Sequence, residues 1–436
     1  MVLFYSPKKQ SAAASKGQAY ITDLDYQGVG VAKINGKTWF IENALPGEQV
    51  TFKKLEEKRQ YGIGVSEKIE QASAERQSPF CPHYLKCGGC QMQHISLEKQ
   101  RATKEKALFK SLKKLQPEVQ KMPLIGDDSL HYRRRLKLSI KFDPKQQQLR
   151  IGFRQKNSQE IIAIRQCPVA TQAINEVLPS LLAALQQWTT PKQLGHLEIV
   201  EADNGVTVFL RHIGKMNDGD KRLLQALSAT QKLHLFVQEE DSLTQLAGEH
   251  PHYYIEGKRL DFDIRDFIQV NADVNQKMVA TALQWLAPQK EDRILDLFCG
   301  IGNFTLPLSQ NARYVVGVEG VENMVRQAQQ NAQQNQCDNL QFYPADLTQP
   351  FADQPWAKEK FNKVLLDPAR SGAAFALPHL ASLHAEKILY VSCNPATLVR
   401  DCEILLQLGY VLKQTAMIDM FPHTGHLESI SLFELK

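Results

Sequence analysis

The sequence has no long hydrophobic run. No segment offers about 18 consecutive uncharged apolar residues, the length that a membrane-spanning helix needs. Lys8, Lys9 and a Ser/Ala run stand where a secretory signal would need an apolar stretch. These absences predict a soluble, cytoplasmic protein that does not associate with a membrane. No obligate protein partner is inferred from the sequence. With 436 residues, 43% of them hydrophobic, the chain has room for two or three domains of about 150 residues each.

Cysteine is scarce, with eight residues in the whole chain. Because reducing conditions keep cytoplasmic thiols free, a disulfide framework is not expected. Cys81, Cys87 and Cys90 have the spacing C-x5-C-x2-C, and Cys167 precedes a proline far downstream. Four thiolates of this kind bind either zinc or an iron-sulfur cluster, and on spacing alone zinc is the commoner choice. The C-x3-C-x2-C spacing of radical enzymes is absent.

The net charge of +5 is too small to indicate a polyanionic partner by itself, but the basic residues cluster. Three arginines at 133–135 stand beside Tyr132, and such runs favour phosphate contacts. A second cluster precedes them and is equally typical of a solvated helix face. It consists of Lys99, Arg101, Lys104, Lys106, Lys110, Lys113, Lys114 and Lys121. Because the arginine run at 133–135 favours phosphate contacts, the two clusters together favour RNA binding.

The first part of the chain has the pattern of a small β-domain. Residues 1–15 are expected to form a disordered tail, and residues 16–72 show five short alternating strands separated by Asn35-Gly36 and Pro46-Gly47 turns. This predicts an oligonucleotide-binding barrel, although a β-domain without an RNA partner has the same spacing. Gly28-Val29-Gly30-Val31-Ala32, followed by an Ala-Leu-Pro-Gly-Glu segment at 44–48, resembles the TRAM domain, an RNA-binding module of RNA-modifying enzymes.

The texture of the sequence changes along the rest of the chain. Residues 73–265 mix helical and strand patterns and are expected to form a central α+β domain that carries the cysteine cluster. From residue 266 to 436, apolar strands alternate with longer amphipathic helices. That alternation predicts a doubly wound, Rossmann-like α/β domain, in which ligands bind at the carboxyl ends of the strands.

A glycine-containing loop follows the first apolar strand of this domain. The turn contains Gly300 and Gly302, but Thr305 stands where a dinucleotide-binding fingerprint requires its third glycine. Glu319 ends the next strand, where a carboxylate can accept the ribose hydroxyls of an adenosine, and Asp346 ends the third strand near the adenine. This ordered set predicts an S-adenosylmethionine site.

Two further strands end in polar residues of a different kind. Asp367-Pro368-Ala369-Arg370 follows one strand, in place of the Pro-Pro-aromatic pattern of amine methyltransferases, and Cys393 follows the next. A thiolate that adds to carbon 6 of uracil raises the electron density at carbon 5, and a carboxylate such as Glu428 then removes the carbon 5 proton. Taken alone, a cysteine at a strand end is more often a small buried apolar residue, and a glutamate in a late strand is usually solvated. Cys299, Cys337 and Cys402 are expected to be structural.

Together these motifs resemble the RNA uracil-C5 methyltransferase family over essentially the whole chain. The matching segments include Asp296-Leu297-Phe298-Cys299-Gly300, Ser392-Cys393-Asn394-Pro395 and His426-Leu427-Glu428. The resemblance implies that Cys393 is the nucleophile and Glu428 the base, and that Phe267 and Gln269 meet the flipped uracil. The residues that it implies at the cofactor are Gln269, Phe298, Asn303, Glu319, Asp346 and Asp367.

The combination of a TRAM domain with a cysteine cluster is similar to the branch of the family that acts on 23S ribosomal RNA. By this resemblance Cys81, Cys87, Cys90 and Cys167 hold a four-iron, four-sulfur cluster, with a role in folding or RNA docking, because methyl transfer to an enolate requires no electron. Two alternatives remain: the same chemistry on another ribosomal or transfer RNA uridine, or a ribosome assembly factor that binds RNA without catalysis. The presence of both Cys393 and Glu428 argues against the second.

Overall fold

A computed structural model describes residues 15–436 of the chain. All of the predicted tail except residue 15 lies outside this range. The chain divides into two compact units, which are described separately. Within the described residues, the first unit contains 15–80, 90–107 and 423–425, and the second contains 81–89, 108–422 and 426–436. Helix α1 (Leu97–Leu115) begins in the first unit and ends in the second.

The first unit contains a six-stranded sheet in the order β1-β5-β6-β4-β3-β2. Its core holds Trp39 and Phe52, whose rings lie against Gly62 and Gly64, where a Cβ atom would come within 2.5 Å of each ring. One predicted strand is divided in two, so that six strands replace the expected five. The strands are β1 (Lys16–Tyr20), β2 (Asp23–Leu24), β3 (Gly30–Ile34), β4 (Lys37–Glu42), β5 (Gln49–Glu57) and β6 (Tyr61–Gln71).

The predicted Asn-Gly turn of this sheet is present. Asn35 and Gly36 join β3 to β4, and both have positive φ angles, 49° and 76°. A two-residue hairpin of this kind matches the right-handed twist of its strands, which explains why Asn-Gly is favoured there.

The second unit contains two large sheets, and the C-terminal one has eight strands in the order β19-β18-β17-β20-β21-β23-β22-β7. The five strands from β19 to β21 run parallel, and β23 is inserted antiparallel beside β21. Its strands are β17 (Arg293–Leu297), β18 (Tyr314–Glu319), β19 (Leu340–Pro344), β20 (Lys363–Leu366), β21 (Lys387–Ser392), β22 (Tyr410–Ile418), β23 (Glu428–Leu435) and β7 (Gln120–Lys121). This is the predicted doubly wound α/β architecture.

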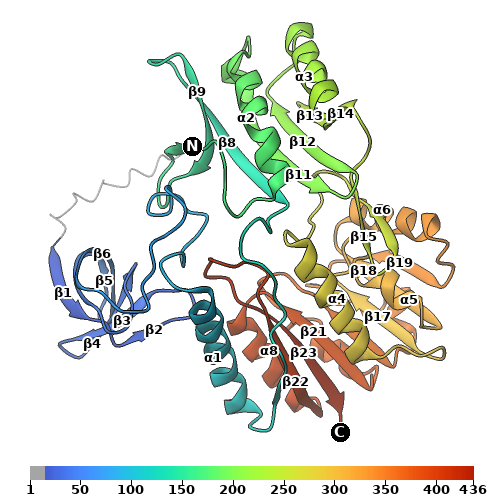
Figure 1. Cartoon of the computed structure of the whole chain (residues 1–436). Coiled ribbons are helices and arrows are strands. Elements are labelled where there is room, and N and C mark those ends of the chain that lie inside the picture. Colours follow the sequence, from blue (N-terminus) through green and yellow to red (C-terminus); the bar gives the residue numbers. More distant parts are fainter. Residues whose placement is uncertain (1–14) are drawn as a thin grey trace, which may run out of the picture. The chain divides into compact units, whose positions relative to one another are not determined.

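Helices cover both faces of this sheet. Figure 1 shows α4 and α8 on opposite sides of β21 and β23. The apolar side chains of α4, α5 and α6 share one core with the sheet. The helices are α4 (Ala272–Leu286), α5 (Thr305–Ser309), α6 (Glu322–Gln334), α7 (Leu377–Ala381) and α8 (Pro395–Gln407), with a short 3-10 turn, η2 (Pro355–Lys358).

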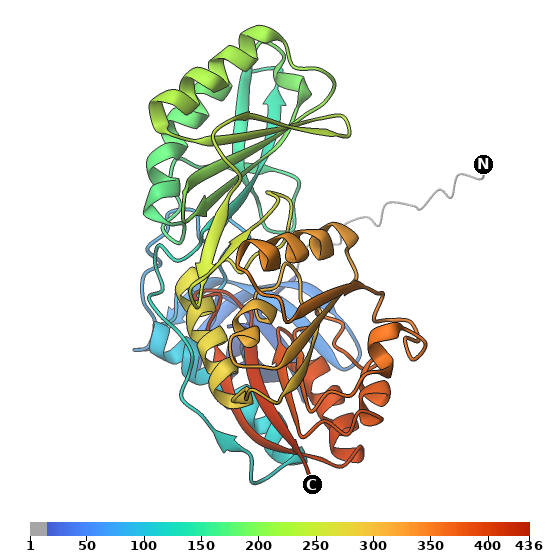
Figure 2. The same cartoon turned by 90° about the vertical axis from the view of Figure 1, so that its right-hand side faces the viewer.

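The other large sheet of the second unit has seven strands in the order β10-β9-β8-β11-β12-β13-β14. Helices α2 and α3 pack on one of its faces, as the green part of Figure 2 shows, and share a separate apolar core with it. The elements are β8 (Arg135–Asp143), β9 (Gln148–Arg154), β10 (Ile161–Ala163), α2 (Gln172–Gln186), η1 (Pro191–Gln193), β11 (Leu194–Ala202), β12 (Gly205–His212), α3 (Asp218–Gln231), β13 (His234–Glu239) and β14 (Ser242–Ala247).

A two-stranded hairpin, β15 (His252–Ile255) and β16 (Lys258–Asp261), follows this central sheet in the chain. The predicted central domain also contributes β7, which pairs with β22 at the edge of the C-terminal sheet. The division at residue 265 therefore stays a prediction. Among the helices of residues 15–436, none combines the length and the apolarity that crossing a membrane requires.

Candidate active site

The carboxyl ends of the parallel strands meet at one edge of the C-terminal sheet, where an open α/β fold binds its ligands. Glu319 ends β18, Asp367 directly follows β20 and Cys393 directly follows β21. Asp346 lies two residues beyond the end of β19 and is exposed. The order of the strands thus gathers these predicted site residues at a single edge.

The loop after β17 has the backbone conformation of a ligand cradle. Phe298, Gly300 and Gly302 all have positive φ angles, 65°, 56° and 98°. The Glu319 carboxylate accepts hydrogen bonds from the backbone N–H of Gly300, at 3.1 Å, and of Val321, at 3.0 Å. Gly300 and Gly302 therefore adopt positive φ angles that glycine tolerates and other residues rarely adopt. The carboxylate of Glu319, predicted to bind the ribose, is held directly beside this loop.

Asn303, in the same loop, is fixed by two partners from outside it. Its side-chain amide exchanges two hydrogen bonds of 3.0 Å with the amide of Asn275 in α4, and its Oδ1 also accepts one of 3.0 Å from the Tyr253 hydroxyl. Gln269 precedes α4, and its carbonyl accepts a hydrogen bond of 2.8 Å from Nε of Arg134. Sequence reasoning missed Tyr253 and Asn275, which no local motif distinguishes.

Two carboxyl groups in this region have strongly perturbed pKa values. Burial raises the pKa of Asp296, within β17, to about 8, and that of Asp367 to about 7. The Thr305 hydroxyl donates to Oδ2 of Asp296 at 2.5 Å, while Oδ1 has no hydrogen-bond partner among residues 15–436. Asp346 behaves differently, because hydrogen bonds from Thr348 lower its pKa.

The nucleophile and base candidates are brought together by strand pairing. In the antiparallel pair of β21 and β23, Ser392 lies opposite Ser429. Cys393 directly follows Ser392, and Glu428, which is 9% exposed, directly precedes Ser429. The charge of Glu428 raises the pKa of the Cys393 thiol, so the two side chains lie near one another. The register thus brings together two residues that are separated by more than thirty positions in the chain.

The electrostatic surroundings of Cys393 are unfavourable to a thiolate. Burial first, and then the charges of Glu428 and Asp367, raise the pKa of the Cys393 thiol to about 11. The positive charge of Arg370 acts in the opposite direction. Nη2 of Arg370 lies 3.2 Å from Nδ1 of His426, two residues before Glu428. Arg370 therefore favours ionisation of the Cys393 thiol.

Phe267 lies at the entrance to α4 and is 65% exposed, an unusual state for a phenylalanine. The preceding segment is held by Arg135, which donates hydrogen bonds to the carbonyls of Ile264 and Asp266. An exposed ring on a fixed segment is suited to stacking on a base.

The structure corrects the interpretation of the basic runs. Arg134 is 4% exposed and lies 4.6 Å from the centre of the Tyr253 ring, and Tyr132 is buried with its hydroxyl donating to the Pro422 carbonyl. Lys104 of the earlier cluster is 1% exposed. These three side chains are not available to an RNA backbone. For Tyr132 and Arg134 the reason is that buried and more exposed positions alternate along 131–137.

Exposed cations gather instead on the face of the central sheet that α2 and α3 do not cover. Leu136 and Leu138 of β8 point into the helix-covered core, so Lys137 and Lys141 point to the opposite face. The same alternation places Arg154 of β9 and Arg211 of β12 there. All four are exposed. Glu198, the buried acid of this face, is paired with Arg135, Lys137 and His196, and its pKa is lowered to about 2.

The cysteines of the predicted metal site are divided between the two units, with Cys90 in the first and the other three in the second. Burial raises the pKa of the Cys87 thiol, and the neighbouring Cys167 and Cys81 raise it further. The Gly89 N–H donates to Sγ of Cys87 at 3.4 Å. Within residues 15–436 no group of three or more His, Cys, Asp or Glu side chains is arranged to hold a metal ion.

The other cysteines agree with the structural role expected of them. Cys299 and Cys402 are buried, Cys337 is half-buried, and none of the eight cysteines, all of which lie in the described range, forms a disulfide.

Comparison with known proteins places these features in a family. Residues 96–436 match the model described as tRNA (Uracil-5-)-methyltransferase, and residues 18–65 match the TRAM domain. The chain is 57% identical over 436 residues to the 23S rRNA (uracil(1939)-C(5))-methyltransferase RlmD of Histophilus somni, covering 100% of this chain and 99% of the relative. It is 56% identical over 435 residues to the protein of the same name from Pasteurella multocida, covering 100% of each.

A solved structure has the same fold over nearly the whole length. It is that of the Pyrococcus abyssi tRNA (uracil-54, C5)-methyltransferase in complex with S-adenosyl-L-homocysteine, with a TM-score of 0.75 and 22% identity, covering 95% of this chain and 99% of that one.

Proposed function

The chain belongs to the tRNA (uracil-5-)-methyltransferase family, and from this premise we propose that it methylates carbon 5 of a uridine in 23S ribosomal RNA with S-adenosylmethionine as the methyl donor. The observation that carries the proposal is the pairing of β21 with β23, whose last pair, Ser392 and Ser429, brings the adjoining Cys393 and Glu428 near one another at the edge that holds the cofactor loop. The names of the relatives suggest the nucleotide equivalent to uracil 1939 as the target.

The residues of the loop edge fit an adenosine-containing methyl donor. Gly300 and Gly302 leave room for close approach of a ligand, Glu319 is suited to the ribose hydroxyls, and the half-buried Asp367 lies near enough to the reacting thiol for its charge to raise the pKa of that thiol. Gln269, Phe298, Asn303 and Asp346 complete the proposed set around the cofactor. When bound there, S-adenosylmethionine supplies an electrophilic methyl group.

The two reacting side chains carry the remaining steps. Cys393 loses its proton and adds to carbon 6 of the uracil, which places negative charge on carbon 5 and makes it nucleophilic towards the methyl group. Glu428 then takes the proton from carbon 5, the carbon 5–carbon 6 double bond re-forms, and the sulfur leaves as a thiolate. Because the thiol has a raised pKa, only a small fraction of it is ionised at neutral pH.

The RNA is proposed to lie along the exposed cations of the helix-free face of the central sheet as well as at the active-site edge. Lys137, Lys141, Arg154 and Arg211 present four exposed cations there, a pattern suited to a phosphate backbone. Phe267 is positioned to stack on the flipped target base, whose unstacking costs a few kcal/mol unless the RNA is already looped.

We also propose that Cys81, Cys87, Cys90 and Cys167 bind a four-iron, four-sulfur cluster, with zinc as the alternative. Two observations support thiolate ligands at close range. The charges of Cys167 and Cys81 raise the pKa of the Cys87 thiol, and the Gly89 N–H donates a hydrogen bond to Sγ of Cys87. Absorption near 400 nm and iron analysis of anaerobically purified protein distinguish the two metals. No step of the methyl transfer is assigned to this group.

The proposed reaction is tested by incubating the protein with a 23S transcript and cofactor labelled in the methyl group. Transfer of label to a single uridine, as mapped by mass spectrometry, is expected. Binding of the transcript without any transfer would favour an assembly factor. Transfer to a tRNA transcript instead would show that the substrate is a tRNA and not 23S ribosomal RNA.

A further inference from the structure

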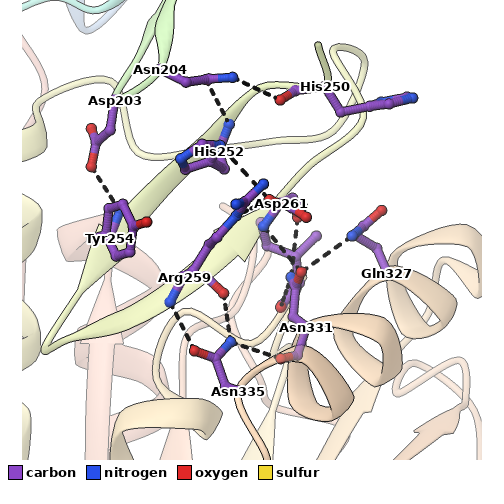
Figure 3. Close-up of polar contacts among 11 residues, drawn as sticks. Asp203, Asn204, His250, His252, Tyr254, Arg259, Asp261, Gln327, Asn331 and Asn335 are labelled. Carbon is purple, nitrogen blue, oxygen red and sulfur yellow. Dashed lines mark hydrogen bonds and ion pairs between the residues drawn. The ribbon is translucent and has the colours of Figure 1, made fainter.

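The hairpin formed by β15 and β16 lies between the central sheet and helix α6, and polar groups of its neighbours, most of them side chains, bind both of its edges (Figure 3). A two-stranded hairpin leaves the outward N–H and C=O groups of alternate residues unpaired on each edge. In this protein most of those groups bind asparagine and aspartate side chains from the two flanking elements. The His252 carbonyl instead accepts from the backbone N–H of Asp203, and the Tyr254 carbonyl accepts from Nε2 of Gln276 in α4.

On the edge formed by β16, two asparagines one helical turn apart imitate a neighbouring strand. Oδ1 of Asn331 accepts from the N–H of Asp261 at 3.0 Å, and its Nδ2 donates to the Asp261 carbonyl at 3.1 Å. Asn335 binds Arg259 in the same manner, at 2.9 and 2.6 Å. Each amide thus satisfies both backbone groups of one outward-facing residue (Figure 3).

On the edge formed by β15, the turn between β11 and β12 of the central sheet has the same function. The N–H of Asp203 donates to the His252 carbonyl at 2.8 Å, and the Asp203 carboxylate accepts from the N–H of Tyr254 at 2.8 Å. The side chain of Asn204 binds the N–H of His252 at 3.2 Å and the carbonyl of His250 at 3.0 Å. The hairpin is therefore fastened to the same sheet that carries the exposed cations.

Two contacts continue from this assembly into the cofactor loop. Nδ2 of Asn331 also donates to the carbonyl of Ile301, between the two loop glycines, at 3.1 Å. From the hairpin itself, the Tyr253 hydroxyl donates to Oδ1 of Asn303 at 3.0 Å. Asn331 is fully buried and Tyr253 is 3% exposed, so water cannot easily replace either bond. Asn335 makes no such contact, since the second acceptor of its Nδ2 is the Asn331 carbonyl.

We propose that Asn331 and Tyr253 are positioning residues that hold the 298–304 loop in its cofactor-binding conformation, and that the hairpin thereby couples the central sheet to the methyl-donor site. The proposal rests on the proposed function, because it assigns the loop to S-adenosylmethionine. Phe298 and Gly302 have positive φ angles, and ordering such a loop costs free energy. When flanking hydrogen bonds fix the loop before the ligand arrives, ligand binding no longer has to supply that part of the free energy.

The test compares Asn331→Ala with Asn335→Ala, which removes an equivalent clamp on the hairpin without touching the loop. Affinity for S-adenosylhomocysteine is measured by calorimetry on the full-length protein, and the melting temperature is recorded for each variant. We expect Asn331→Ala to weaken binding about tenfold, since it loses a buried hydrogen bond to the loop, and Tyr253→Phe to weaken it a few-fold. Asn335→Ala should stay within about twofold of the wild type.

Steady-state kinetics separate positioning from simple loss of structure. The KM for S-adenosylmethionine should rise in Asn331→Ala and Tyr253→Phe, while kcat at saturating cofactor returns close to the wild-type value. Equal affinities in all three variants and the wild type would overturn the inference, as would an equal loss in Asn335→Ala. If Asn331→Ala does not fold, Tyr253→Phe decides alone. A wild-type protein that binds no S-adenosylhomocysteine would instead reject the proposed function.

Discussion

The two large sheets of the second unit carry their functional residues in different places. In the C-terminal sheet the proposed site residues Glu319, Asp367 and Cys393 stand where strands end. In the central sheet the exposed cations stand along the strands, on alternate residues of one face. A strand end is marked in the sequence by a change from apolar to polar residues, whereas a face is shared by strands that are far apart in the chain. The first kind of site is visible in a sequence motif and the second requires the fold.

The largest expected effect concerns the C-terminal sheet. Replacement of Cys393 by alanine removes the nucleophile and should abolish methylation of a 23S transcript below detection, because no neighbouring group replaces covalent activation of uracil. Affinity for S-adenosylhomocysteine, measured on the same preparation, should remain close to that of the wild type. Measurable turnover in Cys393→Ala would remove this residue from the reaction.

Loss of the base should be smaller but still large. Glu428→Gln is expected to reduce the rate by about 10²- to 10⁴-fold, the usual contribution of a positioned general base. Since the carbon 5 proton then leaves slowly, methylated RNA should accumulate as a covalent adduct that denaturing electrophoresis detects. Ser429→Ala, the next residue along β23, is the matched control and should form no lasting adduct.

These two residues illustrate what sequence could predict. The apolar strand, the helix pattern after it and the Cys-Asn-Pro segment between them are enough to place Cys393 at the carboxyl edge. The contact with Glu428 depends on β23 being inserted antiparallel between β21 and β22, and a local pattern cannot specify which strands pair. The same limit applies to Asn331 and Tyr253, which reach the cofactor loop only through tertiary packing.

The central sheet has its own test, with a smaller expected effect. Replacing Lys141, Arg154 and Arg211 together by glutamine should weaken RNA binding about ten- to a hundredfold at moderate salt. The slope of log K against log salt should also fall by about one for each phosphate that the variant no longer neutralises. Binding of S-adenosylhomocysteine should be unchanged. An unaltered salt slope would show that this face does not bind the RNA backbone.

The basic runs show why this face escaped sequence reasoning. Arg133 to Arg135 are the most conspicuous cations in the sequence, yet Arg134 is buried against Tyr253 and Arg135 is paired with Glu198. Lys141 and Arg154 belong to no run at all. Alternation along β8 and β9 brings them to one surface, so density of charge in the sequence is a poorer guide than the side of the strand on which each residue lies.

The smallest effect is expected from Arg370, and it should appear as a shift with pH. Burial and two neighbouring carboxylates raise the pKa of Cys393 to about 11, and Arg370 opposes them. At pH values well below this pKa, the thiolate fraction rises about tenfold for each unit of pH. The rate of adduct formation with 5-fluorouridine RNA should therefore increase from pH 6 to 9. Arg370→Gln should move this profile a few tenths of a unit to higher pH, and Arg370→Lys should largely restore it.

The central claim is that the thiol of Cys393 attacks the target uridine, and a single measurement tests it most directly. The protein is incubated with S-adenosylmethionine and a 23S fragment that contains 5-fluorouridine, whose fluorine cannot be removed as a proton, so the adduct is trapped. Tandem mass spectrometry of the digested complex should locate the methylated nucleotide on the peptide containing Cys393, and Cys393→Ala should yield no adduct. An adduct on another residue, or one that persists in Cys393→Ala, would contradict the proposed mechanism.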